Sequence, residues 1–111
     1  MNTEPYVSIK QEVLAKLEKE LPLLREKYEI KTIGLFGSVS RGEDTPESDI
    51  DLLYTFQNGA ISLERFLDLA DHLEHLFGRK VELVSEKWLS SYLRPYVEKE
   101  VIMYGAGAGT A

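Results

Sequence analysis

The chain has 111 residues, contains no cysteine and carries a formal net charge of −6. Its length suits one small domain, and the lack of cysteine excludes disulfides and cysteine-based zinc sites. The acidic balance argues against a protein that binds a nucleic-acid backbone over many phosphates, since such binding needs a basic face. No apolar run approaches the roughly 20 residues of a membrane helix, and no signal-peptide pattern opens the chain. We therefore expect a cytoplasmic protein without membrane contacts or stable nucleic-acid binding.

Helical and extended patterns alternate along the first half of the chain. Apolar residues recur every three or four positions over 9–28, which predicts an amphipathic helix with Ser8 as a candidate N-cap. Pro22 predicts a kink or break just before it, because proline lacks the amide hydrogen that a helix interior needs. Residues 30–36 are apolar and partly β-branched, as in a strand. Residues 37–48 have the Gly, Ser, Asp and Pro content of a loop that could hold one helical turn.

A second strand and a second helix are predicted next. Residues 49–56 have strand composition, and a turn is predicted at 57–59. The apolar positions of 62–77 return to helical spacing, with Ser62 as the predicted N-cap and Gly78 as the predicted C-cap.

The last part of the chain predicts a third strand over 80–84 and a final helix over 86–104 with a discontinuity at Pro95. This order of elements predicts one domain over 1–104, of the α/β (α+β) class, in which helices pack on a small sheet. The low-complexity residues 105–111 are expected to form a flexible tail.

Two acidic residues mark the predicted start of the second strand. Side chains at positions i and i+2 of a strand point to the same face, so Asp49 and Asp51 are expected to lie side by side while Ile50 points into the core. Adjacent carboxylates repel each other unless a cation lies between them, and hard oxygen ligands of this kind suit Mg²⁺. Taken alone, such a pair is also found as two solvated acids on an edge strand.

A glycine–serine pair lies where the first strand is predicted to end. Gly37 lacks a β-carbon and lets a phosphate approach the backbone, while Ser38 offers a hydroxyl and an amide hydrogen. Gly42 would let the chain turn back toward the second strand. Taken alone, the pair also fits an ordinary strand-to-helix turn. A phosphate-binding loop and a metal-binding pair at adjoining strand ends would face one crevice, and together they predict a site for a nucleotide with Mg²⁺.

The pair Gly37-Ser38, ten intervening residues and a DxD motif that starts at Asp49 resemble the signature of the polymerase-beta-type nucleotidyltransferases. The longer string GSVSRGEDTPESDIDLL, in so short a chain, is similar to the minimal nucleotidyltransferases of that superfamily. The resemblance extends over about residues 33–85. It implies their fold, a small mixed sheet of three to four strands flanked by helices.

The same resemblance implies a set of catalytic carboxylates. Asp49, Asp51 and Glu82 would act in catalysis and hold two Mg²⁺ ions, with ATP as the substrate. Glu82 is out of pattern in an apolar strand, which fits a site. It also fits the outward face of an edge strand. Many relatives carry Asp at this position, and Glu is one methylene longer, so its competence as a base stays open.

The resemblance also implies nucleotide-binding residues in the loop. Gly37 and Ser38 would orient the phosphates, and Gly42 would shape the turn. Arg41 would offset the charge of the triphosphate by bidentate hydrogen bonds, or it is simply a solvent-exposed arginine.

Several other polar and aromatic residues are not expected to form the site. The remaining acids of the loop are expected to be solvated: Glu43, Asp44 and Glu47. His72 and His75 have a spacing of three but no third ligand nearby in sequence, so we expect surface or boundary histidines. Three aromatic residues of the last predicted helix are expected to belong to the core or to an interface: Trp88, Tyr92 and Tyr96.

The short chain leaves no room for the extra domains with which larger relatives bind their acceptors. The resemblance implies the antitoxin half of a two-gene pair, with a HEPN-type ribonuclease toxin as its partner in a hetero-oligomer. It implies transfer of AMP from ATP to a tyrosine of that toxin. Two alternatives stay open. One is a non-catalytic antitoxin of the same fold, and the other is a transferase for an aminoglycoside-like small molecule.

Overall fold

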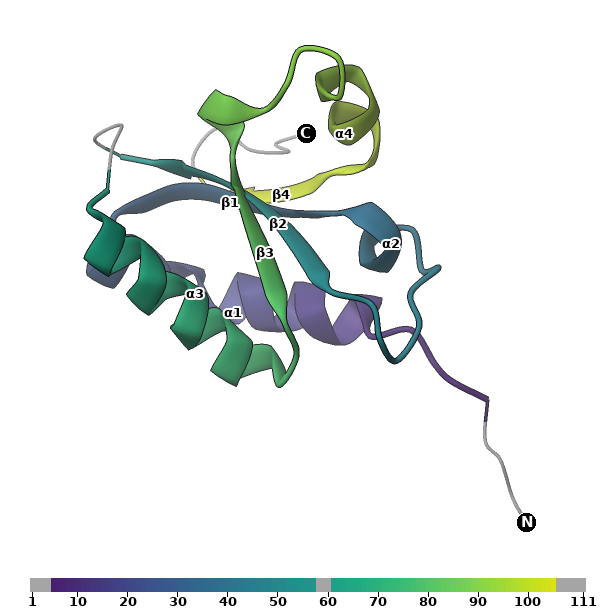
Figure 1. Ribbon diagram of the computed structural model, residues 1–111. Helices are drawn as coiled ribbons and strands as arrows, with labels where there is room; N and C mark the ends of the chain where they lie inside the picture. Colours follow the sequence, from purple (N-terminus) through teal and green to yellow (C-terminus); the bar gives the residue numbers. More distant parts are fainter. Residues whose placement is uncertain (1–4, 58–60, 106–111) are drawn as a thin grey trace.

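The computed structural model describes residues 5–57 and 61–105 as a sheet with helices packed on it (Figure 1). The helices are α1 (Lys10–Tyr28), α2 (Gly37–Ser40), α3 (Leu63–Phe77), the short 3₁₀ helix η1 (Glu86–Trp88) and α4 (Arg94–Glu100). The strands are β1 (Ile30–Phe36), β2 (Ile50–Phe56), β3 (Val81–Ser85) and β4 (Ile102–Gly105). No helix in the described ranges is both long enough and apolar enough to cross a membrane.

The four strands form one mixed sheet in the order β3-β2-β1-β4. β1 pairs antiparallel with both β2 and β4, whereas β2 pairs parallel with β3. A parallel pair needs a crossover connection, and α3 is the helix in that connection. The predicted fold class, a small mixed sheet of three to four strands flanked by helices, is confirmed.

One face of the sheet carries the hydrophobic core. α1 and α3 cover this face, while η1 and α4 lie on the other side (Figure 1). Ile50 and Leu52 of β2 are completely buried there, in one cluster with Leu17 of α1 and Leu69 of α3. Because strand side chains alternate, the burial of Ile50 and Leu52 sends Asp51 to the opposite face. The core therefore decides which side of the sheet carries the polar residues of β2.

Both predicted caps of α3 are present. The Ser62 hydroxyl accepts a hydrogen bond of 3.2 Å from the Arg65 amide at the start of the helix. Gly78 ends the helix with a left-handed φ of 66°, which glycine adopts without steric cost.

α1 differs from its prediction in two details. It runs through Pro22 without a break, so the predicted break is wrong. Leu24, just after Pro22, is completely buried, and such packing on the sheet compensates for the hydrogen bond that proline cannot make. Ile9 rather than Ser8 is the N-cap residue, although the Ser8 hydroxyl accepts a hydrogen bond of 3.1 Å from the Lys10 amide.

The single helix predicted over 86–104 is wrong, because this stretch forms η1, α4 and β4. Pro95 lies in the first turn of α4, where its missing amide hydrogen costs nothing. β4 then pairs with β1, and Gly34 of β1 leaves the space that the Met103 side chain of β4 fills. Pairing of this kind depends on contacts between distant residues, which the spacing of apolar residues cannot show.

The predicted C-terminal tail and the turn predicted at 57–59 lie largely outside the described residues. Gly105 is the last residue of β4, so the tail predicted from residue 105 starts at least one residue too early. Residues 106–111 lie outside the described residues, as does most of the turn predicted at 57–59.

Candidate active site

The polar residues of the site meet where β1 ends and β2 begins. These strands run antiparallel, so Phe36 at the end of β1 pairs with Asp51 near the start of β2. Gly37 follows Phe36 directly. β2 and β3 run parallel, and Asp51 pairs there with Glu82. The register of the sheet therefore brings Gly37, Asp51 and Glu82 together from three separate parts of the chain.

The two aspartates of the DxD motif occupy the beginning of β2. Asp49 is the residue before the strand, Ile50 is completely buried, and Asp51 is half-buried on the face away from α1 and α3. Asp49 is close enough for its charge to raise the pKa of Asp51. The structure thus places the two carboxylates near each other, with Ile50 in the core.

Gly37 is required by its backbone conformation and by its neighbour. Its φ of 77° lies in the left-handed region that favours glycine. A β-carbon at this position would overlap the Oδ2 atom of Asp51 and lie 3.0 Å from its Cγ atom. The carboxylate of Asp51 therefore packs against the backbone of the glycine–serine loop, and no other residue type leaves that space free.

The rest of the loop forms a tight turn. Ser38 is half-buried in α2, and its carbonyl accepts a hydrogen bond of 2.9 Å from the Glu43 amide. Gly42 has a φ of 71°, but a β-carbon there would meet no atom within 4 Å. Gly42 is therefore needed for the turn, whereas Gly37 is needed for the turn and for the close approach of Asp51.

Every neighbour that acts on the pKa of Asp51 raises it. Burial raises the pKa of Asp51 to about 7. A hydrogen bond with Glu82 and the negative charges of Glu82, Asp49 and Glu100 act in the same direction. Asp51 is therefore only partly ionised near neutral pH when no cation is bound, which is typical of carboxylates that share a functional site.

The donor set fits Mg²⁺ in its chemistry. Within residues 5–57 and 61–105, no three or more His, Cys, Asp or Glu side chains are grouped so that they could hold a metal ion among themselves. Mg²⁺ is usually bound by one or two carboxylates together with substrate phosphates and water, so a full protein cage is not needed. The pair of Asp51 with Asp49 supplies such oxygen ligands, and burial together with neighbouring negative charges raises the pKa of Asp51.

Another carboxylate, Glu100, contacts the loop. The Gly37 amide donates a hydrogen bond of 2.7 Å to Glu100 Oε2, and Arg41 Nη1 donates one of 2.7 Å to Glu100 Oε1. Arg41 Nε donates to Glu43 at 2.9 Å. No motif in the sequence marks Glu100, because it falls inside the stretch that was predicted to be one continuous helix.

The loop is tied to the N-terminal segment by Asp44. This residue is only 7% exposed, so the expectation that it is solvated is wrong. Its carboxylate accepts hydrogen bonds from the Ser8 hydroxyl, from the Tyr6 hydroxyl at 2.5 Å and from the Ile9 amide at 3.2 Å. Arg79 adds bonds to the Tyr6 hydroxyl and to two carbonyls of the loop. These contacts hold the loop independently of Glu100.

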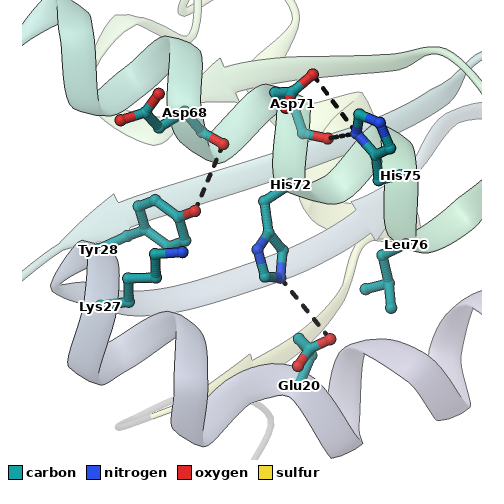
Figure 2. A pocket seen from close by; sticks show the side chains of 8 residues that line it. All are labelled: Glu20, Lys27, Tyr28, Asp68, Asp71, His72, His75 and Leu76. Atoms are coloured by element: carbon teal, nitrogen blue, oxygen red, sulfur yellow. Dashed lines mark hydrogen bonds and ion pairs between the residues drawn. The ribbon is translucent and has the colours of Figure 1, made fainter.

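A groove on the described surface lies away from these residues. It measures about 680 Å³ and lies between α1 and α3, on the helical side of the sheet (Figure 2). His72 packs edge-on against Tyr28, with ring centres 5.6 Å apart, and its Nε2 lies 3.8 Å from Glu20. His75 faces Asp71 on its own helix at 3.5 Å. These histidines make helix contacts, and no metal-binding group includes them among the described residues.

Known proteins of similar sequence match most of this chain. The family model "Polymerase beta, Nucleotidyltransferase" matches residues 18–105. A Methanocaldococcus jannaschii relative, named "Putative protein adenylyltransferase MJ1379", is 42% identical over 91 residues, which cover 81% of this chain and 88% of the relative. The protein adenylyltransferase MntA of Thermococcus cleftensis is 38% identical over 92 residues, which cover 83% of this chain and 89% of MntA.

The fold comparison gives the same result. A solved structure with the name "Crystal structure of the toxin-antitoxin with AMP-PNP" has a TM-score of 0.66 and 27% identity, over 80% of this chain and 73% of that chain. The family model spans all of the site, from Gly37 through Asp51 and Glu82 to Glu100. The chain therefore belongs to the polymerase-beta nucleotidyltransferase family.

Proposed function

We propose that this protein is an antitoxin that acts as a Mg²⁺-dependent protein adenylyltransferase, moving AMP from ATP to a tyrosine hydroxyl of a HEPN-type toxin. The observation that carries the proposal is the meeting of Gly37, Asp51 and Glu82, which sets a glycine backbone suited to phosphates beside carboxylates suited to Mg²⁺. Relatives named protein adenylyltransferase support the reaction type. A similar fold in a toxin–antitoxin structure with AMP-PNP supports the donor and the class of partner.

The carboxylates would hold the metal. Asp49 and Asp51 would bind Mg²⁺, with Glu82 as the third ligand in a two-ion site. When bound, Mg²⁺ would offset the charge of the triphosphate and lower the pKa of the acceptor hydroxyl. Asp51, whose pKa is about 7 without a cation, would lose its proton as the ion binds.

The other residues would bind and orient the reactants. The backbone at Gly37 and Ser38 and the guanidinium of Arg41 would hold the phosphates that leave as pyrophosphate, and Gly42 would shape their loop. The acceptor oxygen would bond to the α-phosphorus as the bond to pyrophosphate breaks. Glu82 would take the acceptor's proton, since it is exposed where Asp51 is half-buried and an acceptor from another protein can reach it.

Three exposed aromatic side chains support a protein as the acceptor. The side chains of Trp88, Tyr92 and Tyr96 are 81%, 78% and 67% exposed, so they are not part of the core. Exposed aromatic residues are enriched at protein–protein interfaces. We therefore favour the interface alternative for these residues, in a hetero-oligomer with the toxin in the cytoplasm. The domain predicted over 1–104 would extend at least to Gly105 of β4.

The test is transfer of labelled AMP to the cognate toxin by the purified protein in the presence of Mg²⁺ and ATP. The double variant Asp49→Asn with Asp51→Asn should transfer none while keeping its fold, as judged by circular dichroism. Both proteins should then be compared for neutralisation of the toxin in cells. If the double variant neutralises the toxin as well as the wild type does, the protein neutralises the toxin by contact and the enzymatic proposal is wrong. If an aminoglycoside-like small molecule is labelled and the toxin is not, the proposed acceptor would be a small-molecule hydroxyl and not the toxin.

A further inference from the structure

We infer that Glu100 is an autoinhibitory residue: it competes with the nucleotide's phosphates for the Gly37 amide and the Arg41 guanidinium and must leave them when the nucleotide binds. The inference rests on the proposed function, because it concerns control of the same site.

The contacts of Glu100 resemble those of a bound anion. Its two carboxylate oxygens each accept a hydrogen bond of 2.7 Å, one from the Gly37 amide and one from Arg41 Nη1. A carboxylate and a phosphate both present paired oxygens with negative charge, and hydrogen bonds to such groups are short and strong. The donors proposed for the phosphates are therefore already engaged by a side chain of the protein itself.

The two anions cannot use these donors together. Glu100 already adds its negative charge to those of Glu82 and Asp49 around Asp51. A triphosphate held next to an unmoved Glu100 would meet a further like charge at short range, in a partly buried place where screening by water is weak. Binding of the nucleotide therefore requires Glu100 to turn away or costs affinity while it stays.

The position of Glu100 allows this movement. It is the last residue of α4, a short helix with Val97 as its buried residue, and the chain becomes extended at Val101. The Glu100 side chain is 24% exposed, so solvent is within reach. A helix end with few buried contacts belongs to the parts of a protein that open at low cost.

Arg41 stays in place when Glu100 leaves. Its Nε atom is held by Glu43 at 2.9 Å, independently of the bond from Nη1 to Glu100. Departure of Glu100 would therefore free one edge of a guanidinium that remains anchored by the other. The Gly37 amide is fixed by the turn of the loop, and it would be free at the same moment.

The test measures binding of Mg²⁺-tripolyphosphate by titration calorimetry, since this probe needs the phosphate groups but no base pocket. The wild type is compared with Glu100→Gln, which removes the charge, and with Glu100→Ala, which removes the contact. Glu98→Gln, an exposed acid on the same helix, is the matched control. Thermal melting shows whether each variant is folded, and Glu100→Gln keeps the test valid if Glu100→Ala unfolds.

Both Glu100 variants should bind tripolyphosphate about tenfold more tightly or better, whereas Glu98→Gln should bind like the wild type. Equal or weaker binding of tripolyphosphate by Glu100→Gln overturns the inference; weaker binding is the result expected if Glu100 instead helps to hold Mg²⁺. Absence of binding in the wild type and all variants overturns it too. AMP transfer to the toxin is measured in parallel. Transfer without tighter binding in Glu100→Gln overturns the inference alone, and tighter binding without transfer by any variant overturns the proposed function alone.

Discussion

The carboxylate of Asp51 occupies the space that a β-carbon on Gly37 would fill. This contact joins the two halves of the site, because the same glycine that is proposed to let phosphates approach also lets the metal-binding carboxylate lie against the loop. Gly37 also needs its left-handed φ of 77°. The two requirements can be separated experimentally.

Gly37→Ala should lose AMP transfer by about 100-fold, because the added methyl group displaces Asp51 from its place beside Glu82. It should also lose about 1–2 kcal/mol of stability from backbone strain. Gly78→Ala is the matched control, since Gly78 has a φ of 66° with no atom within 4 Å of an added β-carbon. We expect a similar loss of stability there with normal transfer. Equal transfer by the two variants would contradict the role of the Gly37–Asp51 contact.

The pKa of Asp51 predicts a pH dependence of stability in metal-free buffer. Burial and neighbouring carboxylates raise this pKa from its ordinary value of 3.8 to about 7 in the fold. The folded protein therefore binds a proton that the unfolded chain releases, so the free energy of unfolding should fall as pH rises from about 4 to about 7. Chemical denaturation of the wild type and Asp51→Asn across this range measures the effect.

Asp51→Asn should flatten this dependence and be more stable than the wild type above pH 7. Asp68→Asn, which changes an exposed acid on α3, should leave the dependence as it is. Mg²⁺ should stabilise the wild type at high pH more than it stabilises Asp51→Asn. An unchanged slope in Asp51→Asn would show that Asp51 is not the titrating group.

Glu82 is proposed to act on the acceptor rather than on the nucleotide. Glu82→Gln should slow AMP transfer by about 100-fold or more, the usual loss when a general base is removed, while ATP affinity changes less. Single-turnover kinetics together with an ATP binding curve separate the two quantities. Glu47→Gln, an exposed acid of the loop, should change neither. A normal rate in Glu82→Gln would assign proton removal to another group.

Asp44 should support the loop by its hydrogen bonds. Burial tends to raise the pKa of Asp44, but hydrogen bonds from Ser8, Tyr6 and Ile9 outweigh it and hold the pKa below the usual value. The resulting stability should be present above about pH 4 and be lost as pH falls through the folded pKa. Asp44→Asn should cost about 1–3 kcal/mol at neutral pH, because one or more buried donors lose their partner. Urea unfolding measures the free energy of unfolding of this variant and of Glu47→Gln, the exposed control. Equal free energies for the two variants would contradict the supporting role of Asp44.

Much of the fold and part of the site could be predicted from the sequence. Residues 30–36 and 62–77 have clear apolar spacing, and Ser62 and Gly78 mark the ends of the second helix. Asp49 and Asp51 could be placed on one face because strand side chains alternate with a period of two. Glu82 is out of pattern in an apolar strand, but its place beside Asp51 depends on the register between β2 and β3, and only the family resemblance implied a role for it there.

What could not be predicted depends on contacts between distant parts of the chain. Residues 86–104 have helical spacing, yet their end becomes a strand because β1 offers a free edge for pairing. The pairing of β4 with β1 also brings Glu100, which lies just before β4, to Gly37, so no local pattern could reveal that contact. Asp44 lies in a polar loop, and only the folding of the N-terminal segment over it makes it buried.

The intact mass of the toxin shows whether Asp49 and Asp51 support transfer of a nucleotide to a protein partner. The toxin would be co-expressed with the wild type and, separately, with the variant in which both aspartates are asparagine. We expect a toxin that is heavier by one or more AMP groups only when it is co-expressed with the wild type. An unmodified toxin that the wild type nevertheless neutralises, or equal modification with both proteins, would contradict this expectation.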